Sequence, residues 1–156
     1  MRFLILSLLG LMAHSISSYA NDWESIDISS IKAKLPTVIA VSLNNELISK
    51  DGDKVSAWFR FDSAFISGKL KGKVLRGFYL TEFSCNDNTK IDIKSYSCGI
   101  VGSGDGCIQL PAPENKNPNI LARTPNYLVL NNLCNKQNVG SNLSKLIEYT
   151  PAFEGK

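Results

Sequence analysis

The chain has 156 residues, 20% of them charged, and a formal net charge of +3. So mild a positive charge does not indicate a nucleic-acid partner. A chain of this length buries roughly two thirds of its unfolded surface in one domain. We therefore expect a single domain with its own hydrophobic core and no need for a structural metal.

Residues 1–20 have the pattern of a secretory signal peptide. Arg2 supplies a positive n-region, an apolar run extends from Phe3 to Met12, and Ser18-Tyr19-Ala20 is a small-x-small cleavage sequence. Beyond it, no stretch has the ~20 apolar residues of a spanning helix. No cysteine stands in the segment to carry a lipid. We expect an exported protein, periplasmic or secreted, with its domain in residues 21–156 and neither a membrane span nor a lipid anchor.

Cleavage after Ala20 also removes His14, which is the only histidine. The remaining chain lacks the general base of Ser/His and Cys/His catalysis and the commonest metal ligand. Its carboxylates are scattered, and no motif pairs two of them as in a glycosidase. We therefore expect no enzymatic activity, no metal and no cofactor. An envelope enzyme or enzyme inhibitor that relies on carboxylates or a loop is the alternative.

The four cysteines predict two disulfides, because an even number in an exported chain is typical of disulfide pairing. A hairpin turning at residues 86–88 places Cys85 and Cys98 at opposite ends of a strand, over ~25 Å apart. A disulfide needs Cα atoms within about 7 Å, which excludes that pair. Of the two remaining pairings we favour Cys98 with Cys107, which closes a glycine-rich loop, and Cys85 with Cys134, which ties the C-terminal segment to the sheet.

Alternation of apolar and polar residues and β-branched composition predict about six strands. In chain order they cover residues 21–30, 37–43, 55–62, 69–85, 90–95 and 107–110. Gly72 and Gly77 in the longest run indicate a bulge or a close approach of another group. An exposed loop over 111–119 precedes a short helix at Tyr127–Asn135, and 142–148 predicts a second helical turn. The fold class is therefore α+β, with an antiparallel sheet in up-and-down order and helix mostly at the end.

Two loop motifs are better explained as turns than as ligand sites. Residues 51–53 suggest a calcium loop, but an EF-hand needs glycine and glutamate where this chain has Ser56 and Asp62. Residues 102–106 are rich in glycine, yet they have neither the G-x-S-x-G nor the G-K-[ST] pattern. We expect a tight turn at the first motif and, at the second, a flexible loop at the end of a hairpin.

Lysines recur at every second position in Lys69, Lys71 and Lys73, which places them on one face if the segment is a strand. Arg76 follows them in the sequence, and in a strand its side chain would point to the opposite face. The stripe is a candidate surface for an anionic partner. The alternative is that the lysines protect an exposed sheet edge from pairing with another chain or simply solvate a face.

In its predicted strand, Trp58 lies on the same face as the polar residues, next to Arg60. Either both faces of the sheet are covered, or an aromatic side chain is exposed for recognition. We favour the covered face and keep Trp58 as a candidate partner-binding residue with the basic residues above.

Several short motifs between Trp23 and Cys134 share a pattern with a known family. They are Trp23 itself, Asp27-Ile28-Ser29-Ser30-Ile31, Gly52-Asp53-Lys54-Val55 leading to Trp58, Phe83-Ser84-Cys85-Asn86, Tyr96 before a Gly-Ser-Gly tip, and the late Cys134. In these features the chain resembles the bacterial surface-adhesin protein E-like domain family. The resemblance implies a six-stranded antiparallel sheet, a C-terminal helix held by a disulfide, an envelope location and, for the namesake, binding to host matrix proteins.

The family pattern contains no catalytic residue, so the resemblance assigns none to this chain. Two departures are the missing lipidation cysteine and the additional bridge expected between Cys98 and Cys107. We therefore expect a non-enzymatic binding protein that contacts a protein partner in the envelope or the host matrix. Besides the envelope enzyme or enzyme inhibitor, a structural or assembly factor of the envelope is a second alternative, and a homodimer is left open.

Overall fold

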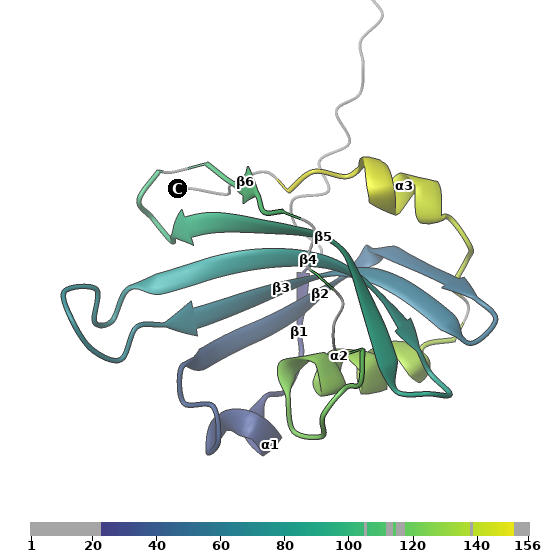
Figure 1. Cartoon of the computed structure of the whole chain (residues 1–156), viewed down its shortest axis with the longest axis horizontal. Helices are drawn as coiled ribbons and strands as arrows, with labels where there is room; N and C mark the ends of the chain where they lie inside the picture. The colour runs from purple at the N-terminus through teal and green to yellow at the C-terminus, as the bar shows by residue number, and fades with distance from the viewer. Residues whose placement is uncertain (1–22, 105, 112–113, 115–117, 138, 152–156) are drawn as a thin grey trace, which may run out of the picture.

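A computed structural model of the chain describes residues 23–104, 106–111, 114, 118–137 and 139–151. Its centre is an open antiparallel sheet in which every strand lies beside its neighbours in sequence (Figure 1). The strands are β1 (Trp23–Ser25), β2 (Val38–Asp51), β3 (Lys54–Ala64), β4 (Val74–Ser84), β5 (Thr89–Ile100) and β6 (Ile108–Gln109), and the helices are α1 (Ser29–Lys32), α2 (Pro125–Cys134) and α3 (Leu143–Glu148). The predicted α+β fold with an up-and-down sheet is confirmed.

Both faces of the sheet are covered, α1 and α2 lying on one side and α3 on the other (Figure 1). β3 shows how the sequence achieves this. Val55, Ala57 and Phe59 face α2, while Trp58 between them faces α3, because successive side chains of a strand point to opposite faces. The two faces form separate cores. The core under α2 includes Ile31, Val41, Leu43, Phe59, Phe83, Val129, Leu130 and Leu133, and the core under α3 includes Leu47, Trp58, Phe78, Leu80, Tyr96 and Leu146.

The first predicted strand is wrong beyond Ser25, where β1 ends. Asp27 accepts hydrogen bonds from the backbone N–H of Ser29 at 2.9 Å and from its hydroxyl at 3.0 Å. Such local bonding competes with strand pairing and favours a turn. The chain therefore turns into α1, which places Ile31, fully buried, in the core under α2.

The turns between the long strands follow the predictions. β2 and β3 meet at residues 51–53, where Gly52 has φ +60°. This left-handed conformation favours glycine. β4 and β5 meet at the predicted turn over 86–88, in which Asn88 has φ +52°. Asparagine tolerates this conformation better than most residues.

The disulfides have the favoured pairing. Cys85 and Cys134 are joined with Cα atoms 5.8 Å apart, and Cys98 and Cys107 with Cα atoms 3.9 Å apart. Cys134 is the last residue of α2 and Cys85 directly follows β4, so the first bridge fixes the helix on the sheet. The second bridge closes the connection between β5 and β6.

Both C-terminal helices are confirmed. α2 starts at Pro125, two residues before the predicted start, and the hydroxyl of Thr124 accepts a hydrogen bond from the N–H of Tyr127 at 3.3 Å. α3 is preceded by Asn142, whose side chain accepts from the N–H of Lys145 at 3.3 Å. Residues 1–20, the predicted signal peptide, lie outside the described residues. No helix in the described part of the chain is both long and apolar enough to cross a membrane.

Candidate functional site

The three lysines of the predicted stripe do not lie in a strand. They belong to the loop over 65–73 that joins β3 to β4, so their expected alternation on a strand face is wrong. The physical reason is two glycines with positive φ, Gly68 at +74° and Gly72 at +81°. These residues turn the chain where an extended strand would continue.

The loop is nevertheless ordered by its own backbone. The N–H of Phe65 donates to the carbonyl of Lys73 at 3.0 Å, and the N–H of Gly72 donates to the carbonyl of Phe65 at 2.9 Å. A further bond joins the N–H of Lys71 to the carbonyl of Gly68 at 3.2 Å. The loop therefore holds its side chains on a defined framework.

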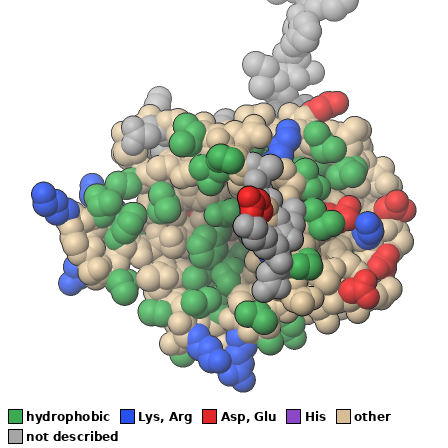
Figure 2. Space-filling view, in the orientation of Figure 1, with side chains coloured by type: hydrophobic (Ala, Val, Ile, Leu, Met, Phe, Trp, Pro, Cys, Tyr) green, Lys and Arg blue, Asp and Glu red, His purple; other side chains and the backbone are tan. Residues whose placement is uncertain are grey.

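This loop combines exposed positive charge with exposed apolar side chains. We call Ile66, Lys69, Leu70, Lys71 and Lys73 the hairpin tip. Ile66 is 61% exposed and Leu70 is 39% exposed. None of the three lysines forms an ion pair with another described residue. Basic side chains are visible at the left-hand end of the molecule in Figure 2, where Figure 1 shows the loop.

Arg76, predicted beside these lysines, has a different role. Its Nε and Nη2 atoms each donate to one carboxylate oxygen of Asp62, both at 2.8 Å. Asp62 is only 5% exposed, and its cross-strand partner in the sheet register is Arg76 itself. This bidentate pair holds β3 and β4 together, so Arg76 is engaged within the fold.

Trp58 is fully buried and presents no surface to a partner. The favoured interpretation, a covered sheet face, is therefore confirmed, and exposure of this aromatic ring for recognition is wrong. Its indole N–H donates to the carbonyl of Leu146 at 2.8 Å. The residue anchors α3 to the sheet.

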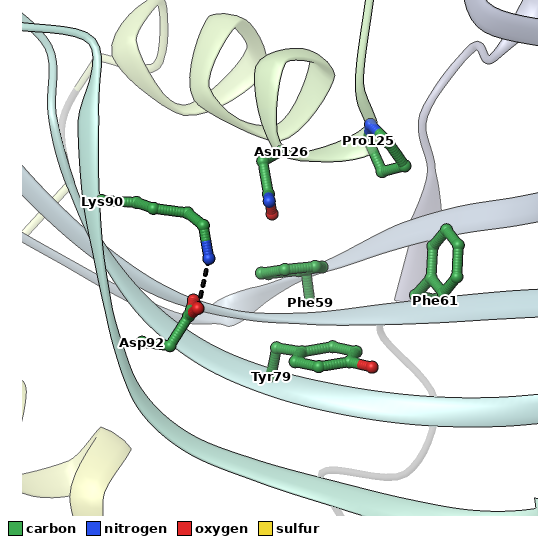
Figure 3. A pocket seen from close by; sticks show the side chains of 7 residues that line it. All are labelled: Phe59, Phe61, Tyr79, Lys90, Asp92, Pro125 and Asn126. Carbon is green, nitrogen blue, oxygen red and sulfur yellow. Dashed lines mark hydrogen bonds and ion pairs between the residues drawn. The ribbon is translucent and has the colours of Figure 1, made fainter. Parts of the chain in front are cut away.

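A pocket of about 230 Å³ opens between the face of the sheet and the first turn of α2 (Figure 3). Three strands and one helix contribute to it. Its lining residues are Phe59, Phe61, Tyr79, Lys90, Asp92, Pro125 and Asn126. It is smaller than the ~300–1,000 Å³ typical of drug-sized ligand sites.

Aromatic rings form the wall of this pocket. Phe59 and Tyr79 are stacked with centroids 5.3 Å apart and an angle of 20° between their planes. Gly77 makes this possible, since a Cβ there would lie 2.9 Å from the Tyr79 hydroxyl. The predicted close approach at this glycine is confirmed. Burial, and secondarily the charge of Asp92, raises the pKa of Tyr79, so the phenol remains neutral at physiological pH.

The opposite end of the pocket is polar. Lys90 forms an ion pair with Asp92, and Asp92 also accepts a hydrogen bond from the hydroxyl of Thr81 at 2.8 Å. The side chain of Asn126 reaches toward the same end from α2 (Figure 3). Its amide has no hydrogen-bond partner within the described part of the chain. Of the residues that the structure describes, Asp92 is the single carboxylate that lines the pocket.

The sequence pattern alone does not bring these residues together. The predicted strands over 55–62 and 90–95 include Phe59, Phe61 and Asp92, but their common face depends on the register between strands. One local signal was available: Thr124 followed by Pro125 is typical of an N-cap and the first residue of a helix. It would have placed Asn126 in the first turn of α2.

Comparisons with protein-family models, with curated proteins and with solved structures found no match. Across the residues that the structure describes, no group of three or more histidine, cysteine, aspartate or glutamate side chains is arranged to hold a metal ion. The surface-adhesin resemblance remains a prediction.

Proposed function

We propose that this chain is an exported, non-enzymatic binding protein that contacts an acidic protein partner through the hairpin tip. The observation that carries the proposal is a loop with three exposed lysines that have no acidic partner among the described residues. The partner is a protein of the cell envelope or of the host matrix, as the surface-adhesin resemblance implies.

The expected location rests on two features. Both cystine bridges are of a kind that persists in oxidising compartments. The first twenty residues have the pattern of a signal peptide. Together they favour a periplasmic or secreted protein.

A protein surface suits the hairpin tip because charge and apolar area lie side by side. Lysines complement carboxylates and accelerate encounter with an acidic surface. Ile66 and Leu70 supply the apolar contact that a stable interface buries at its centre. Since the loop is already ordered by backbone hydrogen bonds, less conformational entropy is lost on binding.

The test is capture of partners from envelope extract and from host matrix on immobilised residues 21–156 with intact disulfides. The double variant Lys69→Ser/Lys71→Ser should lose the captured protein. The control Lys34→Ser/Lys50→Ser, which removes the same charge elsewhere, should retain it. A protein captured equally by both variants would contradict the proposal, as would lysine-dependent binding to anionic lipid vesicles without any protein partner.

A further inference from the structure

We propose that the pocket between the sheet and the first turn of α2 binds a small aromatic molecule that carries one carboxylate. The site is separate from the hairpin tip. It draws on β3, β4, β5 and α2, whereas the hairpin tip lies in the loop between β3 and β4. This inference therefore stands on different residues from the proposed function.

The wall of the pocket selects a flat ring. Phe59, Phe61 and Tyr79 line one side and Pro125 belongs to the helix opposite, as Figure 3 shows. Aromatic rings pack favourably against one another in offset or edge-to-face geometry. The stacked pair of Phe59 and Tyr79 is fixed by the fold, so this wall is formed before a ligand arrives.

The polar end of the pocket favours a ligand group that accepts hydrogen bonds, and in particular a negatively charged one. The ammonium group of Lys90 has three N–H donors, and Asp92 is its one described partner. The side-chain amide of Asn126 offers further donors at the same end. The N-terminus of α2, a helix of ten residues, adds a favourable field for negative charge.

A cationic ligand fits this end less well. Among the described residues, Asp92 is the only carboxylate in the lining, and it already accepts from Lys90 and from the hydroxyl of Thr81. An amine would add a second positive charge beside the ammonium group of Lys90 and would lie in the unfavourable field of the α2 N-terminus. A carboxylate, by contrast, can add to Lys90 and Asn126 without breaking the ion pair.

The volume limits the ligand to one ring or two fused rings with a short acidic arm. Such a group could be a free aryl carboxylic acid or the C-terminal aromatic residue of a peptide. Both present the same ring and the same carboxylate to the pocket. The experiment below includes a probe for each.

The test is an NMR titration of ¹⁵N-labelled residues 21–156 with phenylacetate, indole-3-acetate and the tripeptide Gly-Gly-Phe. At least one probe should shift the backbone amides of Phe59, Tyr79, Lys90 and Asn126. The neutral analogue phenylacetamide and the cation phenethylamine should bind at least roughly tenfold more weakly, as expected for loss of a charged hydrogen bond. Binding of the tripeptide alone would assign the site to peptide C-termini, and binding of the free acids alone to small molecules.

Two variants test the assignment of the polar end. Asn126→Ala should weaken binding of phenylacetate without disturbing the core. Lys90→Met/Asp92→Asn removes both charges together, leaves no unpaired carboxylate, and should abolish the preference for phenylacetate over phenylacetamide. Lys69→Ser/Lys71→Ser, in the hairpin tip, should change neither result.

Several outcomes would overturn the inference. They are no binding of any acid at millimolar concentration, equal binding of phenylacetamide, preferential binding of phenethylamine, or shifts centred outside the pocket. The proposed function fails by a separate criterion, since it depends on capture of a protein that requires Lys69 and Lys71.

Discussion

The indole N–H of Trp58 donates a 2.8 Å hydrogen bond to the carbonyl oxygen of Leu146, which is 88 residues away in the chain. Both residues are buried, and the ring of Trp58 also makes an edge contact with Tyr149 at a centroid distance of 5.3 Å. One side chain of the central sheet thus fixes the C-terminal helix on the face opposite α2.

We expect Trp58→Phe to lower the free energy of unfolding by roughly 2–3 kcal/mol, because it leaves a cavity and an unpaired buried carbonyl. Urea denaturation followed by circular dichroism measures the change. Tyr127→Phe, at a half-buried residue of α2, is a control that should have a much smaller effect. A loss below ~0.5 kcal/mol in Trp58→Phe would mean that α3 contributes little to the fold.

The two disulfides should differ in their contribution to stability. Cys85 and Cys134 close a sequence separation of 49 residues, and Cys98 and Cys107 one of 9. In the chain-entropy model the first bridge contributes about 4 kcal/mol and the second about 2.5 kcal/mol. Paired alanine variants, compared in urea under non-reducing conditions, test this order. A larger loss on removing the shorter bridge would show that loop entropy does not control the difference.

The pair of Arg76 and Asp62 should affect stability rather than partner binding. Arg76→Met leaves the Asp62 carboxylate, whose side chain is 7% exposed, without its bidentate partner. We expect a loss of roughly 2–3 kcal/mol, because two hydrogen bonds to a buried charge are lost, while Arg60, whose Nε lies 3.8 Å from the same carboxylate, stays beside it. The double variant Asp62→Asn/Arg76→Met should be more stable than Arg76→Met alone. If Arg76→Met instead unfolds like the wild type but loses a captured partner, Arg76 belongs to the binding surface.

The features that depend on local pattern were predictable from the sequence. Alternation in β3 identified a strand, and Asp51-Gly52-Asp53 identified its preceding turn. The disulfide pairing also followed, because the hairpin at 86–88 excluded Cys85 with Cys98 and the shorter loop favoured Cys98 with Cys107.

Features that depend on register or on the conformation of a single residue were not predictable. Lys69 and Lys73 alternate as in a strand, and only the positive φ of Gly68 and Gly72 removes them from it. The partnership of Asp62 with Arg76 requires the alignment of β3 with β4. The pocket requires three strands and α2 to be placed together, which no local motif encodes.

Tyr79 should make stability depend on pH in the alkaline range. Its pKa in the folded protein is raised above the ordinary value of about 10, chiefly by burial. As the pH rises, Tyr79 therefore ionises first in the unfolded chain. Its contribution to the free energy of unfolding is complete below the unfolded pKa of about 10. That contribution is lost as the pH rises through the higher pKa of the folded protein. Tyr79→Phe keeps the ring against Phe59 but cannot ionise, so its stability should decline less between pH 8 and about 11. Equal declines in urea denaturation would contradict this assignment.

Replacing Lys69, Lys71 and Lys73 together by serine should weaken binding to an acidic partner while stability changes little. Exposed charges typically contribute under ~1 kcal/mol each, and none of the three forms an ion pair with the rest of the described structure. Affinity of the wild type should also fall as salt rises, since charges are screened within ~8 Å at physiological ionic strength. Surface plasmon resonance at several salt concentrations and urea denaturation separate the two effects. A triple variant that binds normally but aggregates would show that the lysines keep the exposed apolar loop soluble instead of recognising a partner.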